Sequence, residues 1–503
     1  MTSVMHAAEG ATDSAATGRQ AVIVGGGIAG LSAAFRLLRD DPTVQITLLE
    51  AAPRVGGVMQ TEVRDGYVLE KGPDLFLGAK PGGWELATAL GIAGRLHGPR
   101  PGVGGSFLLS RGRLFRLPDG LTGLVPTRMM PFVKTRLISP LGKLRVAMDL
   151  LIPARRGDGD ESVESFVVRR LGREMYAKIV EPLLSGIFAG DGSKLSLAAT
   201  FPHMRAAEVE HGSMTTSMFA AKRRERAAKR AAREAARTAP AGTPAPPAAR
   251  GFLTLPGGQG EMIATLEARL LADPRVTIRT GACTREVLPL GDEGWRVALV
   301  NGECVTADVV ILAVPAYAAA DMIEATDAAC AQAMREIPFV TTATVNLAYR
   351  HDQVPHALDG SGWTTPRAER RPVTACTWTS SKFEGRAPEG MVLLRAFVGD
   401  ATNQTVVQKS DEEIVRVCRR ELAEVLGVTA EPALVQVNRW NWVMPQYNLG
   451  HLERVQRIDE CLARHPGLFV AGNSYRGIGI PDVIKSGEMA ATAAAAMLSS
   501  SSS

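Results

Sequence analysis

Three glycines near the N-terminus have the spacing of a phosphate-binding turn. Gly25, Gly27 and Gly30 fit the pattern G-x-G-x-x-G, and Glu50 follows twenty residues after the last of them. The first glycine permits a tight turn, the second lets the backbone approach a pyrophosphate, and the third lets a helix pack closely on a strand. An acid at this distance can accept hydrogen bonds from ribose hydroxyls. These residue types therefore predict a dinucleotide site.

The elements that must position this turn are visible on both sides of it. Residues 21–24 form a short apolar run typical of a buried strand, residues 31–38 have helical periodicity, and residues 45–49 indicate a second strand. A helix that begins at the glycines presents free N–H groups and the positive end of its dipole to the phosphates. The combination of strand, helix and acid makes the prediction far more specific than a glycine motif alone.

The residues after Glu50 favour a flavin over a nicotinamide cofactor. Arg54 and the pair Gly56-Gly57 lie just beyond the acidic strand end. An arginine here can bind the same pyrophosphate, and the glycines let a loop pass close to it. The arrangement E-x-x-x-R-x-G-G resembles the FAD-binding start of the amine-oxidase-like flavoenzymes. The predicted cofactor is therefore FAD.

A second glycine-rich segment, GNSYRGIGIPD at 472–482, follows a strand-like run near the C-terminus. In the superfamily that the N-terminus resembles, the last strand and helix return to the FAD domain. The resemblance implies that the turn between them covers the flavin. Pro481 suits the first turn of the final helix, and Asp482 suits its positive N-terminal end.

Motifs along the rest of the chain narrow the resemblance to the oxygen-dependent porphyrinogen oxidases of haem biosynthesis. They occur in order from about residue 20 to 495, interrupted only by a basic and Pro-rich stretch. They are GPDLFL at 72–77, SGIFAGDGSKLSLAATFP at 185–202, FLTLPGGQGEMIATL at 252–266, SSKFEGRAPEG at 380–390, RWNWVMPQYNLGH at 439–451 and YRGIGIPD at 475–482.

This resemblance implies a flavin-mediated, six-electron oxidation of a porphyrinogen, with oxygen as acceptor and hydrogen peroxide as product. The ending GIGIPD and an ordinary soluble composition favour coproporphyrinogen III as substrate. Protoporphyrinogen IX stays open as an alternative. More distant alternatives are an amine oxidase or a carotenoid desaturase of the same superfamily, or a flavin-bound scaffold acting through the basic stretch.

The resemblance also implies the site residues. Those expected to bind the cofactor are Gly25, Gly26, Gly27, Ile28, Ala29, Gly30, Glu50, Ala51, Arg54, Gly57, Gly72, Pro73, Asp74, Leu75, Val287, Trp440, Ile478, Gly479 and Ile480. Phe383 is expected to stack on the tetrapyrrole, and Lys80 is a candidate partner for a propionate. Because the flavin carries the chemistry, we expect neither a catalytic side chain nor a metal ligand set.

The expected fold class is α/β, with a discontinuous Rossmann-like FAD-binding domain, a mixed-sheet substrate domain and a mainly helical cap. The FAD domain is expected from 20–80, 252–318 and 438–498, and the substrate domain from 81–105, 191–221 and 319–437. Residues 106–190 should form the cap. Residues 1–19 read as a disordered leader, and 222–251 as a basic helical and Pro-rich insertion.

Composition and charge restrict the other classes of function. The net charge of +5 arises from residues 222–237, and no aromatic side chains alternate with those charges, which argues against nucleic-acid binding. Six scattered cysteines suggest no disulfide framework, and no long apolar run suggests a membrane span.

We expect a cytoplasmic protein. The amphipathic stretch at 140–156 allows weak association with the inner membrane surface, and hand-over of product to a ferrochelatase is a further expectation. The sequence leaves the oligomeric state open.

Overall fold

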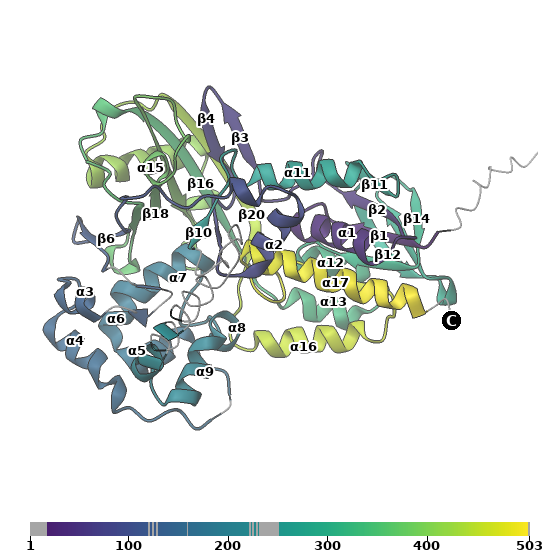
Figure 1. The fold of residues 1–503 in the computed structure, drawn as a ribbon, viewed down its shortest axis with the longest axis horizontal. Coiled ribbons are helices and arrows are strands. Elements are labelled where there is room, and N and C mark those ends of the chain that lie inside the picture. Colours follow the sequence, from purple (N-terminus) through teal and green to yellow (C-terminus); the bar gives the residue numbers. More distant parts are fainter. Residues whose placement is uncertain are drawn as a thin grey trace, which may run out of the picture.

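The computed structural model describes residues 18–500, with gaps at 119–120, 123–124, 127–128, 158, 221–222, 224–225, 228–229 and 231–250. The expected leader and nearly all of the basic insertion lie outside the described residues. Figure 1 shows three parts: a five-stranded sheet with its helices on the right, a seven-stranded sheet at the upper left, and a group of helices at the lower left.

The five-stranded sheet is entirely parallel. Its order is β11 (Val276–Thr280), β2 (Gln45–Glu50), β1 (Gln20–Val24), β15 (Val309–Leu312) and β21 (Leu468–Val470). Side chains of β1 alternate between two cores, with Ile23 in one and Val22 in the other. Both faces are therefore buried, as parallel sheets require. The strands predicted at 21–24, at 45–49 and before residue 472 are confirmed as members of one sheet.

Helices cover both faces of this sheet. One core contains α1 (Ile28–Asp40), α2 (Pro81–Ala89), α11 (Gly260–Leu271) and α17 (Ile480–Ser500). The other contains α12 (Ala316–Ile323), α13 (Ala328–Arg335), α16 (His451–Leu462) and the antiparallel sheet of β12 (Thr284–Pro289), β13 (Trp295–Leu299) and β14 (Cys304–Ala307). The Rossmann-like α/β architecture is confirmed.

The seven-stranded sheet is mixed. Its order is β20 (Leu434–Pro445), β16 (Phe339–Arg350), β19 (Met391–Val398), β18 (Val373–Trp378), β17 (Gly362–Thr364), β6 (Phe107–Ser110) and β7 (Arg113–Arg116). All its pairs are antiparallel except β17 with β6. Helix α15 (Asp411–Leu426) packs on one face and begins with a capping box between Ser410 and Glu413.

The helical part contains α3 (Met129–Lys134), α4 (Pro140–Ala147), α5 (Val163–Leu171), α6 (Arg173–Met175), α7 (Glu181–Phe188), α8 (Leu197–Thr200) and α9 (Pro202–His211). The sequence at 162–184 has a clear helical pattern, and the structure divides this stretch into several helices. Gly172 interrupts it with φ +93°, and a π-helical turn at Tyr176–Val180 joins the remaining pieces.

The division into domains stays a prediction, and two observations bear on its boundaries. The range 106–190, expected to be mainly helical, begins with the hairpin β6–β7, which belongs to the seven-stranded sheet. Strand β20 pairs with β16 of that sheet, although its residues from 438 onward were expected in the FAD domain. In the part of the chain that the structure describes, no helix is both long and apolar enough to cross a bilayer.

Candidate functional site

The glycine turn lies between β1 and α1, as the spacing predicts. Gly25 has φ +106°, which favours glycine, and a Cβ on Gly30 would lie 1.9 Å from the carbonyl oxygen of Gly25. A Cβ on Gly27 would meet no atom within 4 Å. Helix α1 has no side-chain cap at Gly27, so its first N–H groups face this open space. Room and unpaired donors together fit the pyrophosphate of FAD.

Glu50 and the loop after it close around the same turn. The carboxylate of Glu50 accepts hydrogen bonds from the N–H of Gly26 at 2.7 Å and of Ala52 at 2.8 Å. The Arg54 guanidinium donates to the carbonyls of Val55 and Gly57 at 2.8 and 3.0 Å. Arg54 thus shapes the loop beside the turn, and Glu50 keeps further lone pairs for ribose hydroxyls.

The expected contact between the strand of Val287 and adenine stays a prediction. Val287 is fully buried in β12, and its carbonyl accepts a hydrogen bond from the Thr326 hydroxyl at 2.6 Å. The segment that contacts the end of β2 is Gly281–Ala282, whose N–H groups donate to Ala52 and Glu50, both at 2.9 Å. Thr284 follows at a register shift, with a buried hydroxyl that has no partner among the described residues. Thr284, missed in the sequence, is a further candidate to contact the adenosine end.

Two side chains of the seven-stranded sheet hold the segment 72–75. Trp440 Nε1 donates to the Lys71 carbonyl at 2.8 Å, and Arg395 Nη2 donates to the Gly72 carbonyl. A Cβ on Gly72 would lie 1.8 Å from the Val58 carbonyl oxygen, so the segment passes directly over the loop that follows Gly57. Trp440 and Gly72, which lie far apart in the sequence, are therefore brought together.

A cluster of charges lies behind this segment, with Glu70, Arg386 and Arg395 buried and the other two members partly exposed. It comprises Glu70, Asp74, Lys382, Arg386 and Arg395. Burial alone would raise the pKa of Asp74, but the charges of Lys382 and Arg395 hold that pKa below its ordinary value. Arg395 is 2% exposed, and its Nε and Nη1 find no hydrogen-bond partner in the described structure.

Its three cations exceed its two carboxylates by one charge, so the cluster can stabilise negative charge beside residues 72–75. The sequence analysis assigned no role to either arginine. The available signal was a single arginine inside the apolar run MVLLRAFV, where an exposed charge would not be expected.

The late glycine-rich segment lies between β21 and α17. Asp482 N–H donates to the Gly479 carbonyl at 2.8 Å, which starts α17 at Ile480. A Cβ on Gly487 of α17 would lie 2.1 Å from the Ala29 carbonyl oxygen on α1. The two helices therefore cross closely, and residues 478–480 are fixed relative to the glycine turn.

Tyr447 and His451 contact the backbone of this late segment. The Tyr447 hydroxyl donates to the Asn473 carbonyl at 2.6 Å, and the two rings stack with centroids 3.9 Å apart. His451 Nε2 lies 2.9 Å from the Tyr475 carbonyl oxygen. The segment MPQYNLGH, quoted for its resemblance alone, thus positions the candidate flavin cover.

Lys80 and Phe383, the two expected substrate residues, have different surroundings. Lys80 is exposed, and its Nζ lies 2.5 Å from Asp482 Oδ2, beside the start of α17. Phe383 is 1% exposed, with the charged groups of Lys382 and Arg386 against its ring at 4.9 and 5.5 Å. Contact between Phe383 and a macrocycle would require these side chains to move, whereas Lys80 is already accessible.

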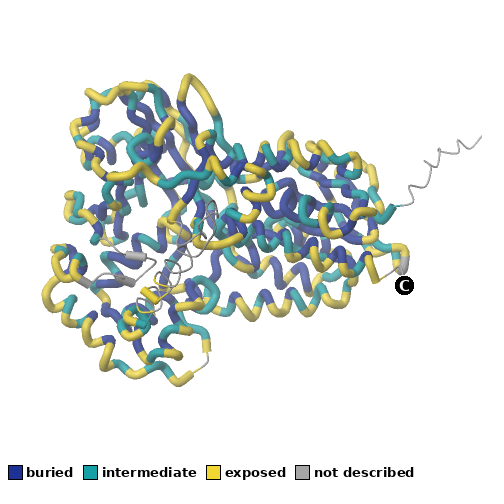
Figure 2. Tube along the Cα trace, in the orientation of Figure 1, coloured by how far each residue is buried: buried dark blue, intermediate teal, exposed yellow. Residues whose placement is uncertain are grey.

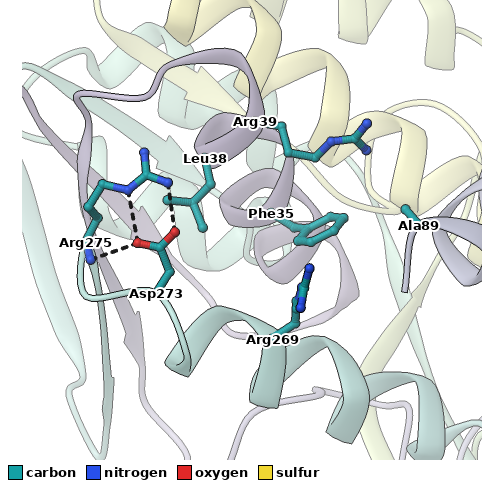
Figure 3. Close-up of a pocket in the computed structure, with 7 residues that line it drawn as sticks. All are labelled: Phe35, Leu38, Arg39, Ala89, Arg269, Asp273 and Arg275. Atoms are coloured by element: carbon teal, nitrogen blue, oxygen red, sulfur yellow. Dashed lines mark hydrogen bonds and ion pairs between the residues drawn. The ribbon is translucent and has the colours of Figure 1, made fainter. Parts of the chain in front are cut away.

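A surface pocket of about 400 Å³ lies elsewhere (Figure 3). Phe35 and Leu38 of α1 and Arg269 of α11 line it, together with the ion pair of Arg275 with Asp273 at 2.8 Å. It is next to the C-terminal half of α1, whereas the glycine turn is at the start of that helix. The pocket contains none of the expected site residues.

Comparison with known proteins agrees with this geometry. Residues 28–495 match the family described as flavin containing amine oxidoreductase. The coproporphyrinogen III oxidase of Bacillus subtilis is 35% identical over 479 residues, covering 94% of this chain and 97% of that relative. The coproporphyrinogen III oxidase of Propionibacterium freudenreichii is 37% identical, covering 92% and 88%.

Solved structures give the same result. A crystal structure from Exiguobacterium sp. 255-15, named as a candidate protoporphyrinogen oxidase, has a TM-score of 0.80 and 31% identity, covering 96% of this chain and 99% of that one. A putrescine oxidase has a TM-score of 0.62 at 19% identity, which shows the shared fold alone. The resemblance to porphyrinogen oxidases is confirmed: this chain belongs to the flavin-containing amine oxidoreductase family, in which it is an FAD-dependent oxidoreductase related to the porphyrinogen oxidases.

Proposed function

We propose that this protein oxidises coproporphyrinogen III to coproporphyrin III in haem biosynthesis, with oxygen as acceptor and hydrogen peroxide as product. The observation that carries the proposal is the identity to named relatives. Three coproporphyrinogen III oxidases are 33–37% identical to the chain, whereas the named protoporphyrinogen oxidases of plants and cattle are 28–29% identical. One further coproporphyrinogen III oxidase is 30% identical to the chain, close to the values for the protoporphyrinogen oxidases. The substrate therefore needs a direct test.

The site supplies binding and orientation for this chemistry. The flavin, when bound, accepts a hydride from the substrate and passes the electrons to oxygen. The N-terminus of α1 and the loop held by Arg54 would hold the pyrophosphate, and Glu50 would hold the ribose. Residues 72–75 and 478–480 would flank the flavin ring. Lys80, which is exposed and paired with Asp482, would exchange that partner for a substrate carboxylate.

The test is a comparison of turnover by the purified enzyme in air on coproporphyrinogen III and protoporphyrinogen IX, followed by porphyrin fluorescence. We expect faster turnover of coproporphyrinogen III, which carries four carboxylates, and one peroxide for each two-electron step. Lys80→Met should raise KM more for this substrate than for the two-carboxylate substrate. Faster turnover of protoporphyrinogen IX would establish the alternative. If neither substrate is oxidised, an amine oxidase or desaturase becomes the next assay.

We further propose that the protein is cytoplasmic and binds the inner membrane surface weakly through α3, α4 and the turn at Met148–Leu150. These elements expose several large apolar side chains: Met130, Val133, Leu141, Leu144, Met148, Leu150 and Leu151. Leu141 and Leu151 are 78% and 82% exposed. Lys134, Arg136 and Arg156 are exposed beside them. Figure 2 shows this edge of the helical part as largely exposed, at the far end from the five-stranded sheet. Apolar contact with basic neighbours suits anionic lipid.

Sedimentation with vesicles tests this second proposal. Phosphatidylglycerol-containing vesicles should retain the protein, vesicles of phosphatidylcholine alone should retain less, and Leu141→Ser with Leu151→Ser should abolish the difference. Val209→Ser, at an apolar side chain that is 65% exposed on α9, is the matched control. Equal binding by both variants would contradict the assigned surface.

Hand-over of the product to a ferrochelatase is part of the proposal as well, because a free porphyrin requires an iron-inserting enzyme to become haem.

A further inference from the structure

Two cysteines from distant parts of the sequence meet beneath the candidate flavin cover. Cys330 is in the first turn of α13, and Cys461 is at the end of α16. The two helices pack against each other and lie side by side in Figure 1. Both side chains belong to one hydrophobic cluster, with Cys330 fully buried and Cys461 partly exposed.

Asp327 joins the backbone at the start of α13 to the residues that follow α16, close to the two cysteines. Its Oδ1 accepts a hydrogen bond from the Cys330 N–H at 2.9 Å. Its Oδ2 accepts hydrogen bonds from Arg464 Nη2 at 2.8 Å and from His465 Nε2 at 3.0 Å. Because Arg464 and His465 follow Cys461 closely in the chain, one carboxylate holds the start of α13 against the end of α16.

The two thiols have different environments, which suit different roles. Burial raises the pKa of Cys330 to about 12, and the neighbouring Cys461 acts on it in the same direction. A buried thiol of this kind resists direct oxidation. Cys461 is reachable from solvent and has the guanidiniums of Arg457 and Arg464 beside it. Partial exposure lets peroxide reach the Cys461 sulfur, whereas the Cys330 sulfur is shielded.

The pair is also adjacent to the loop that the proposed function places over the flavin. Tyr475 of that loop is buried in the same cluster as Cys330. Its hydroxyl has no hydrogen-bond partner among the described residues. Tyr475 lies only three residues before Ile478, so a change in the packing of Cys330 is transmitted directly to the loop.

We propose that Cys330 and Cys461 are a peroxide-sensitive pair that forms a disulfide and thereby loosens the loop at 475–480. The Cys461 thiolate attacks one oxygen of hydrogen peroxide, the O–O bond breaks, and water leaves after protonation. The Cys330 thiol then attacks the resulting sulfenic sulfur, the S–S bond forms, and its proton leaves with the hydroxyl as a second water. Two thiols lose two electrons, and one peroxide is reduced to two waters.

The chain offers a matched control pair. Cys376 on β18 and Cys418 on α15 are also near each other, but both are buried, and burial raises the pKa of both thiols. Peroxide cannot reach either thiol while the protein is folded. The exposed Cys283 and Cys304 can be replaced by serine in every variant, so that oxidation there does not obscure the result.

The experiment treats the FAD-loaded C283S/C304S protein with hydrogen peroxide, without substrate, and maps its peptides by mass spectrometry. We expect a disulfide between the peptides of Cys330 and Cys461, reversed by dithiothreitol. It should be absent from C461S, and C330S should accumulate a sulfenic acid at Cys461 that a dimedone probe labels. C376S should behave as the parent does. Oxidation of Cys461 to sulfinic acid with no cross-link would overturn the proposal.

A second readout tests the link to the loop. Release of FAD, followed by the rise in flavin fluorescence on dilution, should be severalfold faster from the disulfide form than from the reduced form, and equal in C330S under both conditions. Unchanged release from a fully cross-linked protein would overturn the effect on the loop. The inference uses the proposed flavin position but adds peroxide directly. Failure of the porphyrinogen assay would therefore leave the peptide map intact, and failure of the map would leave the assay intact.

Discussion

At the scale of single residues, substitutions at Gly27 and Gly30 should distinguish an effect on cofactor binding from an effect on folding. A side chain at Gly27 projects into open space, whereas a side chain at Gly30 strikes the backbone of Gly25 at 1.9 Å. We expect Gly27→Val to fold with the parent's apo melting temperature but to lose FAD, with affinity at least about tenfold lower, or ~1.4 kcal/mol. Flavin absorbance after purification and calorimetry of the apo protein measure the two effects.

Gly30→Ala serves as the control for that prediction. Its new methyl group must displace the turn, so the apo protein itself should lose about 2–3 kcal/mol of stability. A yellow, fully flavinated Gly27→Val protein would contradict the assignment of the turn to the pyrophosphate. A Gly30→Ala protein of unchanged stability would show that the turn can relax.

His451 makes the same region sensitive to acid. Burial lowers the pKa of His451 to about 4, from an ordinary value near 6.5. Its Nε2–H donates to the Tyr475 carbonyl, and its Nδ1 has no partner among the described residues, so an added proton finds no acceptor. The unfolded chain binds more protons between these values. The contribution of His451 is therefore complete above about pH 6.5 and is lost as the pH falls toward 4, by about 3 kcal/mol in all.

Replacing His451 by Gln removes the titration while keeping an amide donor. The parent should lose melting temperature between pH 7 and pH 5, and His451→Gln should lose clearly less over the same range. His465→Gln is the comparison, because His465 is paired with Asp327 and is only partly buried. An identical pH dependence in His451→Gln and the parent would show that His451 does not control the acid response.

How far residues can be predicted depends on how local their cause is. The glycine turn could be predicted because its strand, turn and helix occupy one continuous stretch. Thr284 could not, because its position depends on a register shift against β13. Arg395 could not either, since its partner Gly72 lies 323 residues away in the sequence. Contacts of this kind come from tertiary packing, which a local pattern does not contain.

At the scale of elements, the crossing of α1 and α17 joins the two ends of the chain at the cofactor. Gly487 is the point of closest approach, against the Ala29 carbonyl. Gly487→Val should force the helices apart and cost about 2–3 kcal/mol of stability. Because α17 begins at Ile480, the same change should also weaken FAD binding. Met489→Ala, at a side chain that is 68% exposed on the same helix, should change neither. Calorimetry and flavin titration of both variants are the measurements.

The elements themselves were largely predictable where periodicity is strong. The strands β1 and β2 and the helices α1 and α17 each carry their apolar pattern within one continuous stretch, and the structure confirms them. The hairpin β6–β7 was missed, because β6 enters the large sheet by pairing with β17, which lies more than 250 residues later. Its short strands gain their stability from that distant partner rather than from their own sequence.

At the scale of the whole molecule, one ionic cluster joins the helical part to the large sheet. Arg367, which follows β17, contacts Glu181 of α7 at 3.2 Å and Asp191 at 3.1 Å. Its Nη2 also donates to the Gly190 carbonyl at 2.9 Å. Burial raises the pKa of Glu181 to about 7, even though Arg367 acts to lower it. The Arg367 guanidinium is therefore one of the contacts that hold the helical part against the sheet, together with the hydrogen bond from the Ser185 hydroxyl to Asp400.

Replacing Arg367 by Met should weaken this junction in a pH-dependent way. Two carboxylates lose a partly exposed cation, for which we expect a loss of about 2 kcal/mol near neutral pH, less than for a fully buried pair. Without Arg367 the pKa of Glu181 in the folded protein rises further above its unfolded value, so the folded state then favours the protonated acid. Stability is in that case retained at low pH and lost as the pH rises. The difference in melting temperature between Arg367→Met and the parent should thus be larger at pH 8 than at pH 5. Adding Glu181→Gln to Arg367→Met should remove most of this pH dependence, because no carboxylate then remains at position 181. A difference that is the same at both pH values, with or without Glu181→Gln, would show that the junction does not depend on this charge.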